Sequence, residues 1–523
     1  MKTRNFSTWA VGRLTKVEQI IEKPRFLAIS IIFLMGFLIR LVPLAMSGFT
    51  TEVPYGYGSL YYHFAETILE NNFVFPNIIQ YYSDGGIPFA YPPAPFYLMA
   101  FIDRFTPLST FFLCNYLPTL ISMVTIVAFY FLAKEIFKEK KLILFSTLAY
   151  ALLPTAFSEL IPGEGLCESF GVLIFIVGMI FIYKMFSIEK RKYVLITGLL
   201  FGIAVVGSPG GGYAFGISLL VFSFLKGEGI FDWKKFAIVT LIGALVSSPW
   251  WLMVIHYHGI DVFINAFMLR HSNVLGLIQT TLYFNVFGLF WTTFCLIGIF
   301  YSMIKKDFLL PIWFVVVLIL GGVEIGYINP IPGALLITLG LLKVVIPSFK
   351  KGISGINNGT RLLTTAFIML VILHGVGTAY MTAINIYQSK MFCVPMGEIE
   401  AMEFIKQNTT EDSVFFSIPG ENCMDWNGSV EWFPAIAHRT VLNAAFGSEW
   451  SGDFIQISHN MGDDLKKATE SDHIIDIANK YSVQFTHVYI TRSPSNVNLI
   501  YSLKDSELFE VVYQNQDAIV FAK

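Results

Sequence analysis

About eleven apolar stretches follow one another along this chain, each close to the length that an α-helix needs to cross a lipid bilayer. A helix spans the hydrocarbon core with about 17 to 25 apolar residues. Only 14% of the 523 residues are charged, against about a quarter in soluble domains. The sequence therefore predicts a polytopic α-helical membrane protein with about eleven transmembrane helices. The stretches are residues 27–47, 107–133, 142–158, 168–187, 193–207, 209–225, 235–256, 281–303, 308–323, 331–347 and 362–386.

Basic residues are concentrated on one side of this predicted membrane protein. With a cytoplasmic N-terminus, the cytoplasmic connections hold most of the lysines, whereas the opposite connections hold only Arg104 and Arg270. This is the asymmetry of the positive-inside rule. An odd number of spans places the C-terminus outside the cytoplasm, and the basic first 26 residues are expected to stay as an uncleaved cytoplasmic segment. The cytoplasmic connections hold Lys134, Lys138, Lys140, Lys141, Lys190, Arg191, Lys192, Lys234, Lys235, Lys305, Lys306, Lys350 and Lys351.

The composition divides the chain near residue 390. Residues 1–390 hold the apolar stretches and a large external loop, residues 48–106, whose aromatic pattern indicates a helix on the membrane surface. Residues 391–523 have the composition of a soluble α/β domain, in which Cys393 and Cys423 are free to form a disulfide if that domain is external. The net charge of −2 offers no basic surface to nucleic acid. Helices are expected over 398–407, 464–468 and 474–481, and strands over 413–418, 440–442, 486–490 and 518–522.

Three motifs mark the first external loop. Tyr57-Gly58-Ser59-Leu60-Tyr61-Tyr62-His63 is followed by Asp84-Gly85-Gly86 and then by Tyr91-Pro92-Pro93. The arrangement resembles the first external loop of the GT-C glycosyltransferases, polytopic membrane enzymes that use polyprenyl-phosphate-linked sugars. Oligosaccharyltransferases and protein mannosyltransferases belong to that family. The resemblance implies a GT-C-like fold, and it implies substrate-binding roles for Tyr61, Tyr62 and His63.

The acidic residue of that family motif is missing here. Gly58 or Ser59 stands where the family has a catalytic or metal-binding Asp. Glu52 and Asp84, which lie on either side of the motif, are the candidate replacements. The loop therefore predicts the family's architecture more directly than its chemistry.

A second acidic segment follows the third predicted span, from Ser158 to Glu168, and looks like the second acidic motif of the same superfamily. If a helix begins by Glu164, that residue and Glu168 share one helical face. Two such carboxylates would bind a divalent cation, Mg or Mn, or one would deprotonate an acceptor hydroxyl. The alternative is that both cap a helix N-terminus, where the helix dipole favours anions.

Cations on the external side suggest a further site. Arg270 and His271 form a cluster there, and an arginine holds a lipid phosphate well in a bidentate grip. Contact with a lipid headgroup at the periphery is the simpler alternative. Arg40 lies inside the first span and is expected to reach the outer boundary or an acidic partner. The turn around Gly207 to Gly212 lacks the lysine of a phosphate-binding loop and is expected to join two helices tightly.

The soluble domain extends the resemblance. Residues 431–442 and 447–450 look like the external domain that follows the membrane part in prokaryotic glycosyltransferase-like proteins. The tryptophans there are suited to stack on sugar rings, although packing in the core is the commoner role of a tryptophan. The residues expected to bind substrate in this domain are Trp432, Arg439 and Trp450.

Together these features predict a membrane glycosyltransferase. The resemblance implies transfer of a sugar from a polyprenyl-phosphate donor to an extracytoplasmic glycan, lipid or protein acceptor. Glu164 and Glu168 are the first catalytic candidates, followed by Asp84 and Glu52. The main alternative is a non-catalytic relative that binds lipid-linked glycan or a partner enzyme. A transporter is disfavoured, because the acidic residues gather at the outer boundary and no matching halves are evident.

Overall fold

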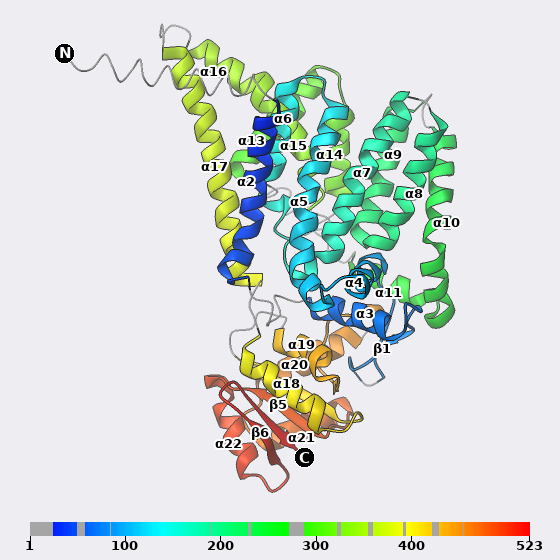
Figure 1. The fold of residues 1–523 in the computed structure, drawn as a ribbon, viewed down its shortest axis with the longest axis vertical. Coiled ribbons are helices and arrows are strands. Elements are labelled where there is room, and N and C mark those ends of the chain that lie inside the picture. Colours follow the sequence, from blue (N-terminus) through cyan, green and yellow to red (C-terminus); the bar gives the residue numbers. More distant parts are fainter. Residues whose placement is uncertain are drawn as a thin grey trace, which may run out of the picture.

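A helical bundle and a smaller α/β domain make up the computed structural model of the protein (Figure 1). In Figure 1 the α/β domain lies below the bundle, with a layer of short helices between them. The structure describes residues 25–49, 58–83, 85–188, 190–227, 232–270, 287–321, 326–353, 359–390, 394–420, 428–452 and 454–523.

Each predicted apolar stretch overlaps a helix of the bundle. Among the described residues, six helical segments are long and apolar enough to cross a membrane by themselves, and α9, α13 and α14 are shorter apolar helices. The prediction of a polytopic α-helical membrane fold is therefore confirmed. The helices are α2 (Arg25–Met46), α5 (Thr110–Ile136), α6 (Lys140–Leu152), α7 (Leu166–Ile188), α8 (Arg191–Gly207), α9 (Pro209–Leu225), α10 (Trp233–His258), α13 (Leu289–Ile304), α14 (Leu309–Gly321), α15 (Pro330–Leu339), the π-helical η3 (Gly340–Val345), α16 (Ile346–Gly352) and α17 (Gly359–Lys390).

Local signals explain several helix ends. α8 ends at Gly207 and α9 starts at Pro209, and the Ser208 side chain between them accepts a hydrogen bond from the N–H of Gly211. The glycine-rich segment is thus the tight interhelical turn that the sequence predicts, with serine as the N-cap. At the other end of the bundle, Lys184 pairs with Glu135 over 3.0 Å. That pair joins the ends of α5 and α7 away from the α/β domain.

Arg40 does not reach the outer boundary. Its side chain is fully buried between α2, α5 and α6. Nε donates to the Ser122 hydroxyl over 3.1 Å, and Nη1 donates to the Ala151 carbonyl over 3.0 Å. The guanidinium also lies over the Phe157 ring, 4.9 Å from its centroid. Carbonyl, hydroxyl and ring contacts therefore take the place of the boundary or acidic partner expected from the sequence.

The layer between the two parts comes mainly from the loop over 48–106, which the sequence predicts to be external and which keeps the name first external loop below. It holds α3 (Ser59–Glu70), β1 (Ile78–Ile79), β2 (Ile87–Pro88) and α4 (Ala94–Phe105). β1 and β2 pair antiparallel. α11 (Asp261–Arg270) joins the same layer from the end of α10. The helix predicted in this loop is present as α3, with one face buried against aromatic residues.

The α/β domain is built on one five-stranded sheet, ordered β4-β3-β5-β7-β6. β3 pairs parallel with β4 and β5, whereas β7 pairs antiparallel with β5 and β6. One face packs on α18 and α19 toward the bundle, and the other packs on α20, α21 and α22. The strands are β3 (Val414–Ile418), β4 (Thr440–Val441), β5 (His487–Thr491), β6 (Glu510–Gln514) and β7 (Ala518–Ala522); the helices are α18 (Met396–Asn408), α19 (Gly428–Ala437), α20 (Phe454–Lys466), α21 (Ser471–Tyr481) and α22 (Val497–Asp505), with the 3₁₀ turns η4 (Ser448–Ser451) and η5 (Pro494–Asn496).

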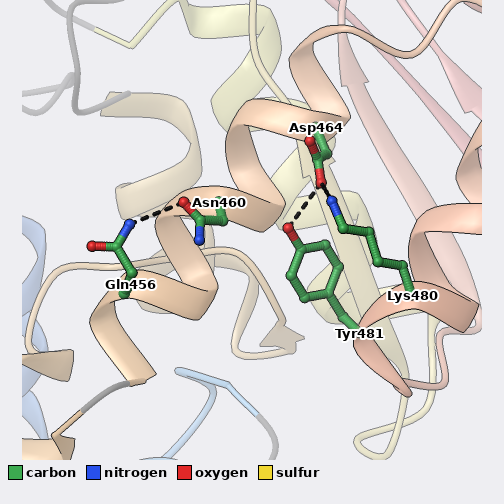
Figure 2. Close-up of polar contacts among 5 residues, drawn as sticks. All are labelled: Gln456, Asn460, Asp464, Lys480 and Tyr481. Atoms are coloured by element: carbon green, nitrogen blue, oxygen red, sulfur yellow. Dashed lines mark hydrogen bonds and ion pairs between the residues drawn. The ribbon is translucent and has the colours of Figure 1, made fainter.

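A polar contact joins two of the outer helices. Asp464 at the end of α20 accepts hydrogen bonds from Lys480 over 2.6 Å and from the Tyr481 hydroxyl over 2.8 Å (Figure 2). Both bonds lower the pKa of the Asp464 carboxyl.

Several elements of the α/β domain differ from those predicted. A helix was predicted only over 464–468, which is a small part of α20, and α19, α22 and β6 were not predicted.

Candidate functional site

The first external loop and the second acidic segment meet at Gly58 and Gly163. A Cβ built on Gly58 would lie 3.2 Å from the Cα of Gly163 and 2.4 Å from the Sγ of Cys114. The Cys114 thiol also donates to the Gly58 carbonyl over 3.2 Å. Two motifs that lie about a hundred residues apart in the sequence are thus in backbone contact. Gly58 is one of the two positions where the family has its Asp, and a side chain there would require Cys114 to shift.

The acidic turn has a different local structure from the one expected. Gly163–Gly165 form a 3₁₀ turn, η2, and α7 begins at Leu166. The α-helix therefore starts after Glu164, so Glu164 and Glu168 do not share a helical face. Glu168 lies in the first turn of α7 and is half-buried. Only the backbone of Glu164 is described, and it stands beside the start of α3.

Several other candidate site residues lie outside the described part of the chain or have only their backbone described. Glu52 and Asp84 lie outside the described residues, as do His271 and both Cys393 and Cys423. Arg270 ends α11, and its backbone alone is described. Within the part of the chain that the structure describes, no three His, Cys, Asp or Glu side chains come together as a metal site.

Tyr61 and Tyr62 lie in an aromatic layer between α3 and the α/β domain. Tyr61 is buried, and its ring centroid is 6.0 Å from those of Tyr91 and Phe446. Tyr62 packs on Trp432 at 5.8 Å, and burial raises its pKa above the usual value. These contacts join the loop to the α/β domain. The rings that make them belong to residues that were predicted to bind substrate.

His63 faces a second histidine across the same junction. Its ring lies 6.0 Å from that of His438, nearly parallel at 29°. Its Nδ1 is buried and has no hydrogen-bond partner among the described residues. Burial lowers the pKa of His63 to about 3 and that of His438 to about 4, with help from Lys406, whose Nζ lies 3.2 Å from the Nε2 of His438. Both imidazoles are therefore neutral near pH 7.

The three residues expected to bind substrate in the α/β domain are packed or bonded in place. Trp432 is fully buried, and Trp450 packs between Tyr91 and Phe263. Arg439 donates through Nη2 to the carbonyls of Lys406 and Thr409 at the C-terminal end of α18, over 2.8 and 2.6 Å. That is the usual way in which a basic side chain stabilises a helix C-terminus.

Two features of this region were not found from the sequence. Tyr82 in the first external loop forms a parallel bridge with Val441 at the edge of the sheet. A cleft also opens between α19, α20 and the ends of β3 and β4, with the buried Glu431 in its wall. A carboxylate within the apolar helix α19 was the signal for this second feature.

The chain was compared with protein families, curated proteins and solved structures. No protein-family model matches the chain, and no curated protein matches it significantly. Solved structures of the Archaeoglobus fulgidus oligosaccharyltransferase do match, over nearly the whole of this chain. The complex of that enzyme, AglB, with an inhibitory peptide and a dolichol-phosphate has a TM-score of 0.62 at 15% identity, covering 90% of this chain and 69% of that one. The chain has the fold of this archaeal oligosaccharyltransferase.

Two further structures of the same archaeal GT-C enzyme agree. Its complex with Zn and sulfate has a TM-score of 0.61 at 15% identity, covering 88% of this chain and 68% of that one. The form tethered to an acceptor peptide with the NVT sequon has a TM-score of 0.61 at 16% identity, covering 89% and 69%. At such identity the likeness establishes the GT-C fold and leaves the reaction to the residues of the site.

Proposed function

We propose that this chain is a membrane glycosyltransferase that moves a sugar from a polyprenyl-phosphate donor to an acceptor outside the cytoplasm. The contact of Gly58 with Gly163 carries the proposal, because it brings the first external loop against the acidic turn. The fold supports it, since the archaeal structure of the same fold holds a dolichol-phosphate. The acceptor class, whether glycan, lipid or protein, is left open.

The reaction follows from the residue types at this junction. The acceptor oxygen forms a bond to the anomeric carbon of the sugar while the bond from that carbon to the donor phosphate breaks. In the proposed site Glu164 or Glu168 takes the proton of the acceptor hydroxyl. Arg270 would stabilise the negative charge that develops on the departing lipid phosphate.

A divalent cation, Mg or Mn, belongs to this proposal with Glu164 and Glu168 as its ligands. Such an ion would neutralise charge on the departing phosphate. The fit is incomplete, because two carboxylates are few ligands for these ions, and the described side chains, which do not include that of Glu164, form no group of three possible metal ligands. No step of the proposed reaction is therefore routed through a metal. The archaeal relative was solved with Zn and sulfate.

We also propose the membrane orientation and the domain division. The N-terminus is cytoplasmic, the boundary lies between residues 390 and 391, and the α/β domain is outside with the 48–106 loop. α16, which carries Lys350 and Lys351, lies at the end of the bundle opposite the α/β domain. That placement supports an orientation in which lysine-rich connections face the cytoplasm.

A non-catalytic relative that binds lipid-linked glycan or a partner enzyme is the second candidate. The lack of space at Gly58 favours it, since neither an Asp nor a smaller side chain fits that position without a shift of Cys114. This candidate predicts donor binding without transfer.

Deletion and complementation separate the two candidates. Surface glycans and polyprenyl-phosphate sugars are measured by mass spectrometry in cells lacking this gene, complemented by the wild type or by the Glu164→Gln, Glu168→Gln double variant. A transferase gives truncated glycans and accumulated donor, rescued by the wild type alone. Unchanged glycans in the deletion strain contradict the transferase, and rescue by an expressed double variant removes these two residues from the reaction.

A further inference from the structure

Glu431 holds two consecutive backbone amides inside the α/β domain. It lies on α19 and is 3% exposed. Its Oε1 accepts from the N–H of Ala445 over 3.1 Å, and its Oε2 accepts from the N–H of Phe446 over 3.2 Å. A buried carboxylate with both oxygens engaged in this way fixes the position of the segment that donates to it.

The segment that Glu431 holds is the surface on which the first external loop rests. Residues 445–450, called the seat below, pack along that loop. Phe446 contacts the Tyr61 ring at 6.0 Å, and Trp450 contacts the Tyr91 ring at 5.2 Å. Gly447 adopts a φ of +90°, and a Cβ there would lie 2.4 Å from the Cδ1 of Ile87. Phe446, Gly447 and Trp450 of the seat thus touch three separate positions of the loop, Tyr61, Ile87 and Tyr91.

The seat lies close to the acidic turn. The Cβ position of Gly447 is 2.9 Å from the Cδ2 of Leu60, in the first turn of α3. Gly58, just before α3, touches Gly163 of the acidic turn. A movement of the seat would therefore shift the start of α3, and with it the contact on which the proposed site depends.

The charge state of Glu431 is sensitive to pH near neutrality. Burial raises its pKa to about 7, although the two amide hydrogen bonds act in the opposite direction. Tyr82 approaches it from the first external loop, and its own pKa is raised further by this carboxylate. Because burial raises the pKa of this carboxyl, the closed arrangement binds a proton more tightly than an opened, solvated one, and this contribution to stability is lost as the pH rises through about 7. Across the cleft, α20 contributes His459, Asp463 and Lys466.

We propose that Glu431 is a positioning residue whose buried carboxyl group, through its hydrogen bonds to the amides of Ala445 and Phe446, holds the seat in place for the first external loop. The inference deepens the proposed function, on which its consequence for catalysis rests. The effect on the seat itself is independent of any reaction. In this arrangement the α/β domain controls the order of the membrane-side site through a single buried acid.

Hydrogen–deuterium exchange of the full chain in nanodiscs tests the proposal directly. Protection of peptides covering 443–450 is measured at pH 6 and pH 8, after correction for the intrinsic pH dependence of exchange. The wild type is expected to lose up to about tenfold in protection between pH 6 and pH 8, because an opened, solvated carboxyl becomes charged at a lower pH than the buried one, whose pKa is near 7. Equal protection of the wild type at both pH values would overturn the proposal.

Substitutions separate the charge from the packing. Glu431→Gln keeps the shape but presents an NH₂ group to one of the two amides, so protection should be low and independent of pH. Glu431→Asp still titrates but is shorter, so a variant that folds should keep a pH dependence at lower protection. Wild-type protection of the seat in a folded Glu431→Gln variant contradicts the role.

Glu398 provides the matched control. It is another buried acid of the same domain, 2% exposed, and it accepts from the hydroxyls of Tyr489 and Thr491 rather than from the seat. Glu398→Gln should leave the exchange of 443–450 unchanged. If sugar transfer is detected, Glu431→Gln should also flatten the alkaline limb of its pH profile. Absence of transfer together with the expected exchange pattern would reject the proposed function and leave the role of Glu431 standing.

Discussion

Tyr82 of the first external loop pairs with Val441 of the α/β domain as a short parallel extension of the sheet. The N–H of Val441 donates to the Tyr81 carbonyl, and the N–H of Ser83 donates to the Val441 carbonyl, each over 3.0 Å. The edge of β4 is therefore covered by a segment of the membrane domain rather than left open. Together with the seat, this pairing makes the loop and the domain one packed unit.

Replacing Gly447 by Ala should weaken that unit. The residue sits at φ +90°, and its new Cβ would approach the Cδ1 of Ile87 to 2.4 Å. Strain and overlap together predict a loss of about 1–3 kcal/mol in the free energy of unfolding. Thermal unfolding of the purified protein, followed by tryptophan fluorescence, measures it.

Gly462 is the control for this substitution. It lies inside α20, and nothing stands within 4 Å of its Cβ position. Gly462→Ala should be neutral or stabilising by up to about 1 kcal/mol, because alanine favours the helix. Equal tolerance of the two substitutions would show that the seat does not press on the loop.

Acid should loosen the junction through His63. The pKa of His63 is lowered in the fold to about 3 from 6.5. The unfolded chain thus binds a proton that the folded chain refuses, so stability is complete above about pH 6.5 and falls as the pH drops below it. His63 alone predicts a slope on the order of 1 kcal/mol per pH unit. His438, with a pKa lowered to about 4, acts in the same direction.

Denaturation midpoints at pH 7 and pH 5 test this dependence. His63→Phe should reduce the difference between the two midpoints, whereas a substitution of the exposed His473 on α21 should leave it at the wild-type value. A His63→Phe variant with the full wild-type difference would contradict the assignment.

The helices of the bundle could be predicted from the sequence because each is marked by a local pattern, a long apolar stretch. An apolar stretch of sufficient length becomes a helix in the bilayer whatever its neighbours are, since every backbone polar group must be satisfied within the segment. Contacts between segments that are distant in the sequence could not be predicted in this way. The Tyr82–Val441 bridge and the contact of Gly58 with Gly163 join residues that no short pattern connects.

The candidate site shows the same division. Helix α19 was missed because Pro434 interrupts an otherwise helical pattern, and Glu431 was missed with it. The helix start at Glu164 was misplaced because the Gly163–Gly165 turn is 3₁₀ and delays α7 to Leu166. Tyr61, Trp432 and Arg439 were chosen by residue type, whereas burial and helix capping occupy them in the fold.

Cysteine labelling in intact cells tests the proposed orientation. Lys140 and Glu507 are exposed, at the α5–α6 connection and in the α/β domain. In a background with Cys393 and Cys423 replaced by serine, a membrane-impermeant maleimide should label Glu507→Cys in intact cells and Lys140→Cys only after permeabilisation. The reverse pattern would invert the topology and remove the charge argument on which it rests.

The space at Gly58 can be tested with a double-mutant cycle. Gly58→Ala should cost about 1–3 kcal/mol in the free energy of unfolding, because its Cβ would lie 2.4 Å from the Sγ of Cys114. The Cys114→Ala substitution removes the thiol and with it part of the overlap. The double variant should therefore lose less free energy of unfolding than the sum of the losses in the two single variants. Rescue should be incomplete, since the Cα of Gly163 also lies 3.2 Å away. Additive effects would mean that the side chain of Cys114 is not what closes the space at Gly58.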